Sequence, residues 1–170
     1  IGDKYAQYML GFMYLTGTGV EEDTLLGSAW YRLAAERGNE LFAEVRDELL
    51  DSLSEADRVR SDELYRRLRR EYSDLVILLE LVESDMRTLS ERTGSRITGG
   101  TSPVTVISPR PQAGVSPADY YSSIERRLET RVSWMREMLA QHGIPIDSRR
   151  TTLSELEDAV EAYLEMTPDR

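Results

Sequence analysis

Residues 16–23, "TGTGVEED", combine two glycines with three acidic side chains, which are residue types found in phosphate-binding and metal-binding loops. A phosphate loop of the P-loop type follows a strand and ends in Gly-Lys-Ser/Thr, whereas this segment follows a helical pattern and ends in acids. A calcium loop needs alternating oxygen ligands over about twelve residues, and Leu15 and Val20 interrupt such a series. The segment is therefore predicted to be a turn between two helices.

The other side chains that could take part in catalysis or metal binding also have simpler, structural interpretations. Glu21, Glu22 and Asp23 precede a helical pattern, where acidic side chains favour the positive end of the helix dipole. His142 is the single histidine, and no nucleophile stands at a motif spacing from it. Its place before Gly143 suits a helix C-terminus, where an imidazolium is favourable. Neither group predicts catalysis or a metal site.

Two carboxylate pairs near the C-terminus, Glu155/Asp158 and Glu157/Glu161, have the residue types of a hydrolase. General acid catalysis needs a carboxyl group with a raised pKa in a cleft. Carboxylates on one exposed amphipathic helix mainly confer solubility. The chain also has no cysteine, which excludes disulfides, thiolate metal sites and a cysteine nucleophile. No catalytic residue, metal ligand or cofactor is predicted.

Charge and hydropathy exclude two further classes of function. The chain has 170 residues, 40% hydrophobic and 31% charged, with a formal net charge of −10. This charge argues against a nucleic-acid binder, which needs a positive face, and against docking on an anionic membrane. The longest apolar run, "LVILLELV" at 75–82, is too short to span a bilayer and contains Glu80. Direct membrane insertion is therefore not expected.

Apolar periodicity and capping signals predict helices along most of the chain. Asp23 and Gly38 bound one of them, while "SEAD" at 54–57 and "TLSE" at 152–155 have the form of capping boxes. "SPAD" at 116–119 is a further helix start. The predicted helices cover residues 3–15, 23–37, 39–53, 55–71, 72–92, 117–141 and 153–166. The middle of 72–92 is apolar nearly all round, so it is expected to be the densest part of the core.

Residues 93–116 differ in composition from the rest of the chain. They are rich in Pro, Gly, Ser and Thr, which predicts a connector rather than a packed element. "VTVI" at 104–107 has the pattern of a short extended strip. The last two helices, joined by "HGIPID", are expected to form an antiparallel hairpin.

Gly2 and Gly38 lie 36 residues apart, a spacing that suggests an internal repeat, although the match fades after one unit. "AQYMLGFMYLTGTGVEED" followed by "AWYRLAAERGN" resembles the Sel1-like repeat, a relative of the tetratricopeptide repeat. The matching positions are Ala6, Leu10, Gly11, Tyr14, Gly17, Gly19, Val20, Asp23, Trp30, Tyr31, Ala34, Ala35 and Gly38. Gly27 departs from the family's usual alanine and is expected to allow a close helix contact.

The resemblance implies an αα-hairpin solenoid used for contacts between proteins, without catalytic residues, often in bacterial envelope systems. The expected architecture is all-α, with a Sel1-like repeat and capping helices over 1–92, a Pro/Gly-rich connector over 93–116 and a C-terminal helical hairpin over 117–170. The expected function is a non-catalytic scaffold or assembly subunit that binds protein partners. The resemblance favours the bacterial periplasm or envelope, with the cytoplasm as the alternative location.

Aromatic side chains are the candidate partner-binding residues, since they dominate interface energetics. The candidates are Tyr5, Tyr8, Phe12, Tyr120, Tyr121 and Trp134. Ordinary packing inside the helical hairpins is the competing interpretation for each of them. A structural homo-oligomer built through the C-terminal helices is the second functional hypothesis, and an envelope-associated hydrolase is the third.

Overall fold

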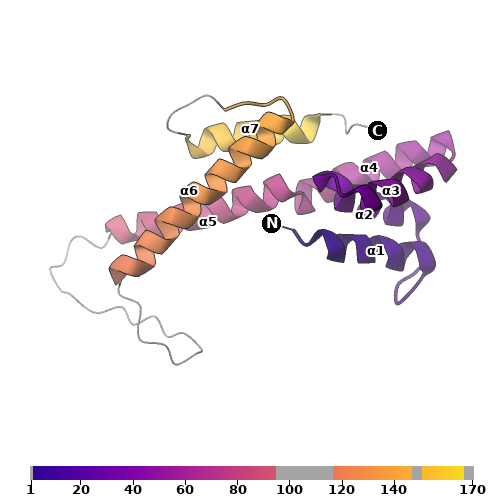
Figure 1. Ribbon diagram of the computed structural model, residues 1–170, viewed down its shortest axis with the longest axis horizontal. Coiled ribbons are helices and arrows are strands. Elements are labelled where there is room, and N and C mark those ends of the chain that lie inside the picture. Colours follow the sequence, from indigo (N-terminus) through magenta and orange to yellow (C-terminus); the bar gives the residue numbers. More distant parts are fainter. Residues whose placement is uncertain (1, 95–116, 147–150, 167–170) are drawn as a thin grey trace. The chain divides into compact units, whose positions relative to one another are not determined.

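The computed structural model describes residues 2–94, 117–146 and 151–166, and every regular element in these ranges is helical. The bounds are α1 Lys4–Thr16, α2 Thr24–Ala34, the short 3-10 helix η1 Ala35–Arg37, α3 Glu40–Ser52, α4 Glu55–Tyr72, α5 Asp74–Gly94, α6 Pro117–Gln141 and α7 Leu153–Glu165 (Figure 1). The all-α prediction is therefore confirmed. The strip expected at 104–107 and most of the expected connector lie outside the described residues.

The helices group into two compact units. Among the described residues, the first unit contains 2–77 and 164–166, and the second contains those between Leu78 and Tyr163. The boundary falls inside α5, so this helix contributes to both cores. The division at 92/93 and 116/117, which was drawn from composition, stays a prediction.

α1 and α2 form an antiparallel hairpin whose backbones approach closely (Figure 1). Asp3 caps α1, and Asp23 caps α2 by accepting a hydrogen bond from the Leu26 amide at 2.9 Å. α2 is buried over most of its length because it packs against α1, α3 and α4. The core cluster of the first unit contains Ala29, Trp30, Leu33, Tyr65 and Leu68, with Leu10, Tyr14, Leu26 and Leu64 packed against it.

α3 and α4 follow with caps of their own. Asn39 and Ser54 accept hydrogen bonds from the Phe42 and Asp57 amides, so each helix begins at a side-chain cap. α4 packs against α2, where the hydroxyls of Ser28 and Ser61 lie 2.6 Å apart in the buried interface. α3 also contacts α2 but has no fully buried residue. It therefore packs on α2 through half-buried side chains.

Asp74, the first residue of α5, fixes the start of α1 to η1. Its buried carboxylate accepts hydrogen bonds from the Gly2 amide at 3.1 Å and from Arg37 Nε at 2.6 Å. Lys4 Nζ lies 3.7 Å from the same carboxylate. Ser73 separates α4 from α5 with extended backbone, so the two helices are interrupted at one residue.

The second unit is built on the later part of α5, on α6 and on α7. Its buried apolar side chains are Leu78, Val82, Ile124, Met135, Leu139, Leu156, Ala159, Val160 and Tyr163. Asp85 of α5 is buried, and its carboxylate forms ion pairs with two arginines of α6. Arg127 Nη2 donates to Asp85 Oδ1 at 2.5 Å, and Arg131 pairs with the other carboxylate oxygen. This pairing joins two helices that the sequence separates by more than twenty residues.

The expected antiparallel direction of the last two helices is wrong. The ring of His142, just after α6, lies 4.8 Å from the ring of Tyr163 near the end of α7. Thr151, just before α7, shares a pocket with Leu128 and Val132 in the middle of α6. Both observations place α7 alongside α6 in the same direction (Figure 1). Arg136 of α6 donates a hydrogen bond to Ile146 O at 3.0 Å, so the chain that follows α6 turns back along this helix.

Candidate interaction surface

The Gly-Thr-Gly loop is a structural turn, as the sequence predicts. Gly17 and Gly19 have φ values of +67° and +78°, a left-handed conformation that favours glycine. The Thr18 amide donates to Met13 O at 3.1 Å, and the Asp23 amide donates to Tyr14 O at 2.8 Å. These bonds close the loop on itself, and Asp23 caps the next helix. The glycines therefore serve the hairpin geometry.

The remaining candidates for chemistry occupy ordinary structural positions. His142 Nδ1 contacts Met138 O at 2.8 Å at the end of α6. Glu155 completes the capping box of α7, since it accepts a hydrogen bond from the Thr152 amide at 2.7 Å. Within residues 2–94, 117–146 and 151–166, no cluster of His, Asp or Glu side chains could hold a metal ion. In the same ranges, no helix is both long and apolar enough for a membrane span.

The outer side of α1 exposes large apolar side chains. Tyr5, Met9 and Phe12 are 65%, 36% and 42% exposed and stand at i, i+4 and i+7, so they share one side of the helix. Tyr8 lies at the edge of this side and is half-buried. We call these four residues the aromatic face. Exposed apolar side chains gathered on one side of a helix make this side the candidate surface for contact with a partner.

Tyr8 attaches the aromatic face to the core and to α3. Its ring meets the ring of Tyr31 edge-on, with 5.0 Å between centroids, and stacks on Phe42 of α3 at 4.7 Å. Burial, with a smaller contribution from the neighbouring Tyr8, raises the pKa of Tyr31 above its ordinary value. Tyr31 is therefore a neutral core group. Tyr8 positions the surface, whereas Tyr5 and Phe12 are free to contact a partner.

α3 also carries an exposed large apolar side chain, Leu41, which is 59% exposed. The N-caps Asp3 and Asn39 are 36 residues apart, and α1 and α3 both have 13 residues. Tyr5 and Leu41 are therefore the second residues of two equivalent helices. The sequence pattern identifies neither Leu41 nor Met9 as a candidate contact residue. The 36-residue spacing between Gly2 and Gly38 was the signal that could have identified Leu41.

The aromatic candidates of the second unit do not form one surface. Tyr120 and Tyr121 are both half-buried and contact each other edge-on, with 5.3 Å between ring centroids. Trp134 stands more than three helical turns farther along α6 and is 47% exposed. Because these residues belong to the second unit, they are considered separately from the aromatic face.

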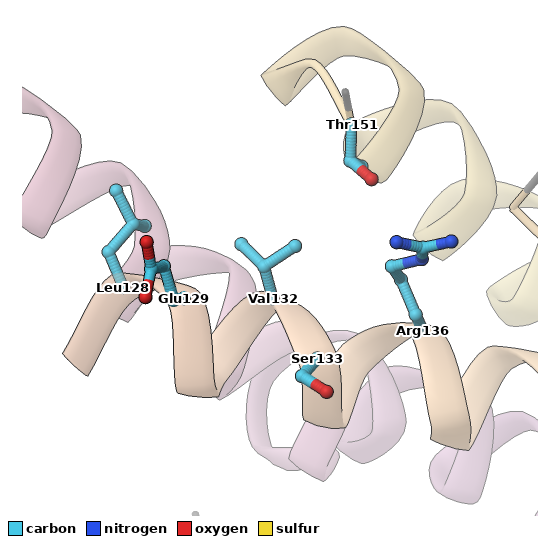
Figure 2. Close-up of a pocket in the computed structure, with 6 residues that line it drawn as sticks. All are labelled: Leu128, Glu129, Val132, Ser133, Arg136 and Thr151. Atoms are coloured by element: carbon cyan, nitrogen blue, oxygen red, sulfur yellow. The ribbon is translucent and has the colours of Figure 1, made fainter. Parts of the chain in front are cut away.

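A pocket of about 320 Å³ lies on α6, lined by Leu128, Glu129, Val132, Ser133, Arg136 and Thr151 (Figure 2). Val132 and Arg136 extend from α6 into the same gap that the Thr151 hydroxyl faces from the other side (Figure 2). That hydroxyl is buried and makes no hydrogen bond within the described part of the chain. The lining offers no nucleophile with an adjacent base, so the pocket has no catalytic constellation of its own.

Comparison with known protein families gave a match for the first helical hairpin. Residues 4–39 match the model of the Sel1 repeat, a range that covers α1, the loop, α2 and η1 and ends at the cap of α3. Sel1 repeats generally mediate contacts between proteins and are typically non-catalytic. No curated protein and no solved structure gave a match to the chain. The resemblance inferred from thirteen sequence positions is therefore confirmed for this segment.

Proposed function

The chain carries a Sel1-like repeat at residues 4–39, and we propose that it is a non-catalytic interaction module that binds a partner protein on the aromatic face of α1. The single observation that supports this surface is the exposure of Tyr5, Met9 and Phe12 on one side of the repeat's first helix. Aromatic side chains bury about 150–250 Å² each when covered, and they are enriched among residues that dominate binding energy.

The rigidity of the surface supports the same proposal. Gly11 and Gly27 bring α1 against α2, and Lys4 at the start of α1 donates to Leu33 O and to Glu36, both at 2.9 Å. The helix that presents the aromatic face is therefore fixed along its length. A surface that is already ordered loses little conformational entropy on binding, which favours affinity.

Site-specific photo-crosslinking in the native host tests this function. A benzoylphenylalanine in place of Phe12 should give an adduct with a specific protein, and one in place of Tyr5 should give the same adduct. The matched control is Val59 of α4, which is also exposed but lies outside the aromatic face. Adducts at position 59 with the same protein, or none at positions 5 and 12, would contradict the proposed surface.

A second candidate function is self-association through the C-terminal helices, favoured by the exposure of Trp134 on α6. If it operates, the sedimentation coefficient of the full chain should rise with concentration, and Trp134→Ala should abolish the rise. A chain that sediments as a monomer at all concentrations would eliminate this alternative. The Phe12→Ala variant serves as the control, since it alters the other surface.

A further inference from the structure

The aromatic face lies beside a helix with excess negative charge. α3 carries a single cationic side chain, Arg46, against several carboxylates: Glu40, Glu44, Asp47, Glu48 and Asp51. Glu44 and Glu48 are one helical turn apart on the exposed side, an arrangement of like charges that disfavours the isolated helix. Within the described residues, no ion pair engages Glu40, Glu44 or Glu48.

The cationic side chains of the first three helices and η1 already have acidic partners. Lys4 pairs with Glu36, and Arg46 pairs with Asp47 of its own helix. Arg32 pairs with Asp62 and also covers the ring of Tyr65, with 4.4 Å from its guanidinium carbon to the ring centroid. Arg37 pairs with Asp74, whose hydrogen bond raises the pKa of the Arg37 guanidinium despite partial burial. No cation of these elements is therefore left to neutralise the exposed face of α3.

The free carboxylates of α3 occupy the same helical positions as the aromatic face of α1. Counting from the caps Asp3 and Asn39, Tyr8 corresponds to Glu44 and Phe12 corresponds to Glu48. Leu41, Glu44 and Glu48 stand at i, i+3 and i+7, so they share one side of α3. The Tyr8–Phe42 ring stack holds the two helices together beside this surface. Apolar anchors and unpaired negative charge therefore lie on neighbouring equivalent helices.

We infer that the partner segment bound here is basic and amphipathic, with large apolar side chains for the aromatic face and Lys or Arg for Glu44 and Glu48. The inference rests on the proposed function and adds the chemistry of the partner. Charge complementarity selects partners and repels acidic ones, because like charges placed together at an interface cost binding energy. α1, with 13 residues, is about 20 Å long, so a segment of about 14 helical residues covers it.

A pair of synthetic 14-residue peptides tests the inference. Both carry Leu at helical i, i+3, i+4 and i+7 spacing, and the remaining positions are mostly Lys in one peptide and mostly Glu in the other. Fluorescence anisotropy with the full chain should give a dissociation constant at least tenfold lower for the Lys peptide. Phe12→Ala should weaken that binding tenfold or more, since the apolar anchor is lost, and circular dichroism should confirm that the variant is folded.

A charge-reversal variant separates local complementarity from the net charge of the chain. Glu44→Lys combined with Glu48→Lys should abolish the preference for the Lys peptide. The matched control, Glu63→Lys combined with Glu137→Lys, makes the same change in net charge at exposed residues outside the surface and should keep the preference.

Three results would overturn the inference: equal binding of both peptides, no binding of either, or an equal loss of preference in the control variant. The photo-crosslinking experiment reads out the partner whatever its charge. A partner segment cross-linked at position 12 and rich in Asp and Glu would therefore reject the basic segment while leaving the proposed function in place.

Discussion

Gly11 and Gly27 face each other across the α1–α2 hairpin, each lying against the other's carbonyl oxygen. A Cβ atom added at Gly27 would lie 3.1 Å from Gly11 O and 3.2 Å from the Leu15 amide nitrogen. A Cβ added at Gly11 would lie 3.0 Å from the ring of Tyr31. The obstructing atoms at Gly27 are backbone atoms, which cannot rotate away. This contact fixes α1, and with it the aromatic face.

Gly27→Ala should therefore destabilise the first unit, although alanine is the better helix former. The gain in helix propensity is about 1 kcal/mol, whereas overpacking of a tight contact costs typically 1–3 kcal/mol. The net loss should be roughly 1 kcal/mol in the free energy of unfolding, measured by urea denaturation. A variant as stable as the parent, or more stable, would show that the two helices separate freely. The close helix contact that the sequence predicts at Gly27 is present in the structure.

The positions of the helices in the first unit could be predicted from the sequence, because capping residues, turn glycines and apolar periodicity are local signals. Asp23 as a cap and Gly17 and Gly19 as turn residues follow from nearby spacing, and the structure confirms them. The helix predicted over 117–141 has the observed bounds. Capping and periodicity act within one or two turns, so one sequence contains the information they need.

Contacts between distant segments could not be predicted in the same way. Nothing near Asp85 in the sequence indicates that Arg127 and Arg131 pair with it, because that pairing depends on how α5 and α6 pack. The predicted direction of α7 was wrong for the same reason, since the residues between Gln141 and Leu153 are enough for either direction. In the candidate surface, the sequence named Tyr5, Tyr8 and Phe12, with ordinary packing as the alternative for each, but could not identify Phe42 as the ring that stacks on Tyr8.

Asp85→Asn should destabilise the second unit. The buried carboxylate is shared by two guanidinium groups, and its loss leaves Arg131 and Arg127 without their charge partner. Breaking a buried ion pair by removing one member costs roughly 3 kcal/mol. The control is Asp47→Asn, which removes an exposed pair with Arg46 and should change the free energy of unfolding by less than about 1 kcal/mol.

The two tryptophans report on different units, since Trp30 lies in the first and Trp134 in the second. ¹⁹F NMR of 5-fluorotryptophan-labelled protein during urea unfolding can therefore locate the effect. In Asp85→Asn the Trp134 signal should shift to its unfolded position at lower urea than in the parent. An unchanged Trp134 transition would show that the Asp85 cluster does not hold the second unit together.

The same cluster predicts a dependence of stability on pH. Burial acts to raise the pKa of Asp85, but hydrogen bonds and charge from Arg127 and Arg131 outweigh it, so the pKa lies below its ordinary value. A carboxyl group with a lowered pKa in the folded state stabilises the fold above its unfolded pKa of about 3.9. That stabilisation is lost as the pH falls through the folded-state pKa.

The difference in unfolding free energy between the parent and Asp85→Asn should accordingly be constant from neutral pH down to about pH 5 and should shrink below about pH 4. Urea midpoints of both proteins at several pH values measure it. Comparing the two proteins removes the contribution of the other acidic residues. A difference that grows on acidification would contradict the lowered pKa of Asp85.

Tyr5 and Tyr8 stand one turn apart on α1, and their substitution should separate binding from folding. Tyr5 is mostly exposed, so Tyr5→Ala should change the free energy of unfolding by less than about 0.5 kcal/mol. Its effect should fall on partner binding, where losing an aromatic anchor costs roughly 2 kcal/mol or more. Tyr8 packs between Tyr31 and Phe42, so Tyr8→Ala should lower both stability and binding.

Thermal unfolding and the yield of the Phe12 photo-adduct, measured on the same two variants, provide the comparison. If Tyr5→Ala lowered the unfolding temperature as much as Tyr8→Ala, the exposed ring would be part of the core and not a contact residue. If neither change lowered the adduct yield, the partner would contact α1 elsewhere. The expected result, a stable Tyr5→Ala that binds its partner more weakly, would show that the exposed aromatic side of the repeat is maintained for recognition, because the fold does not need it.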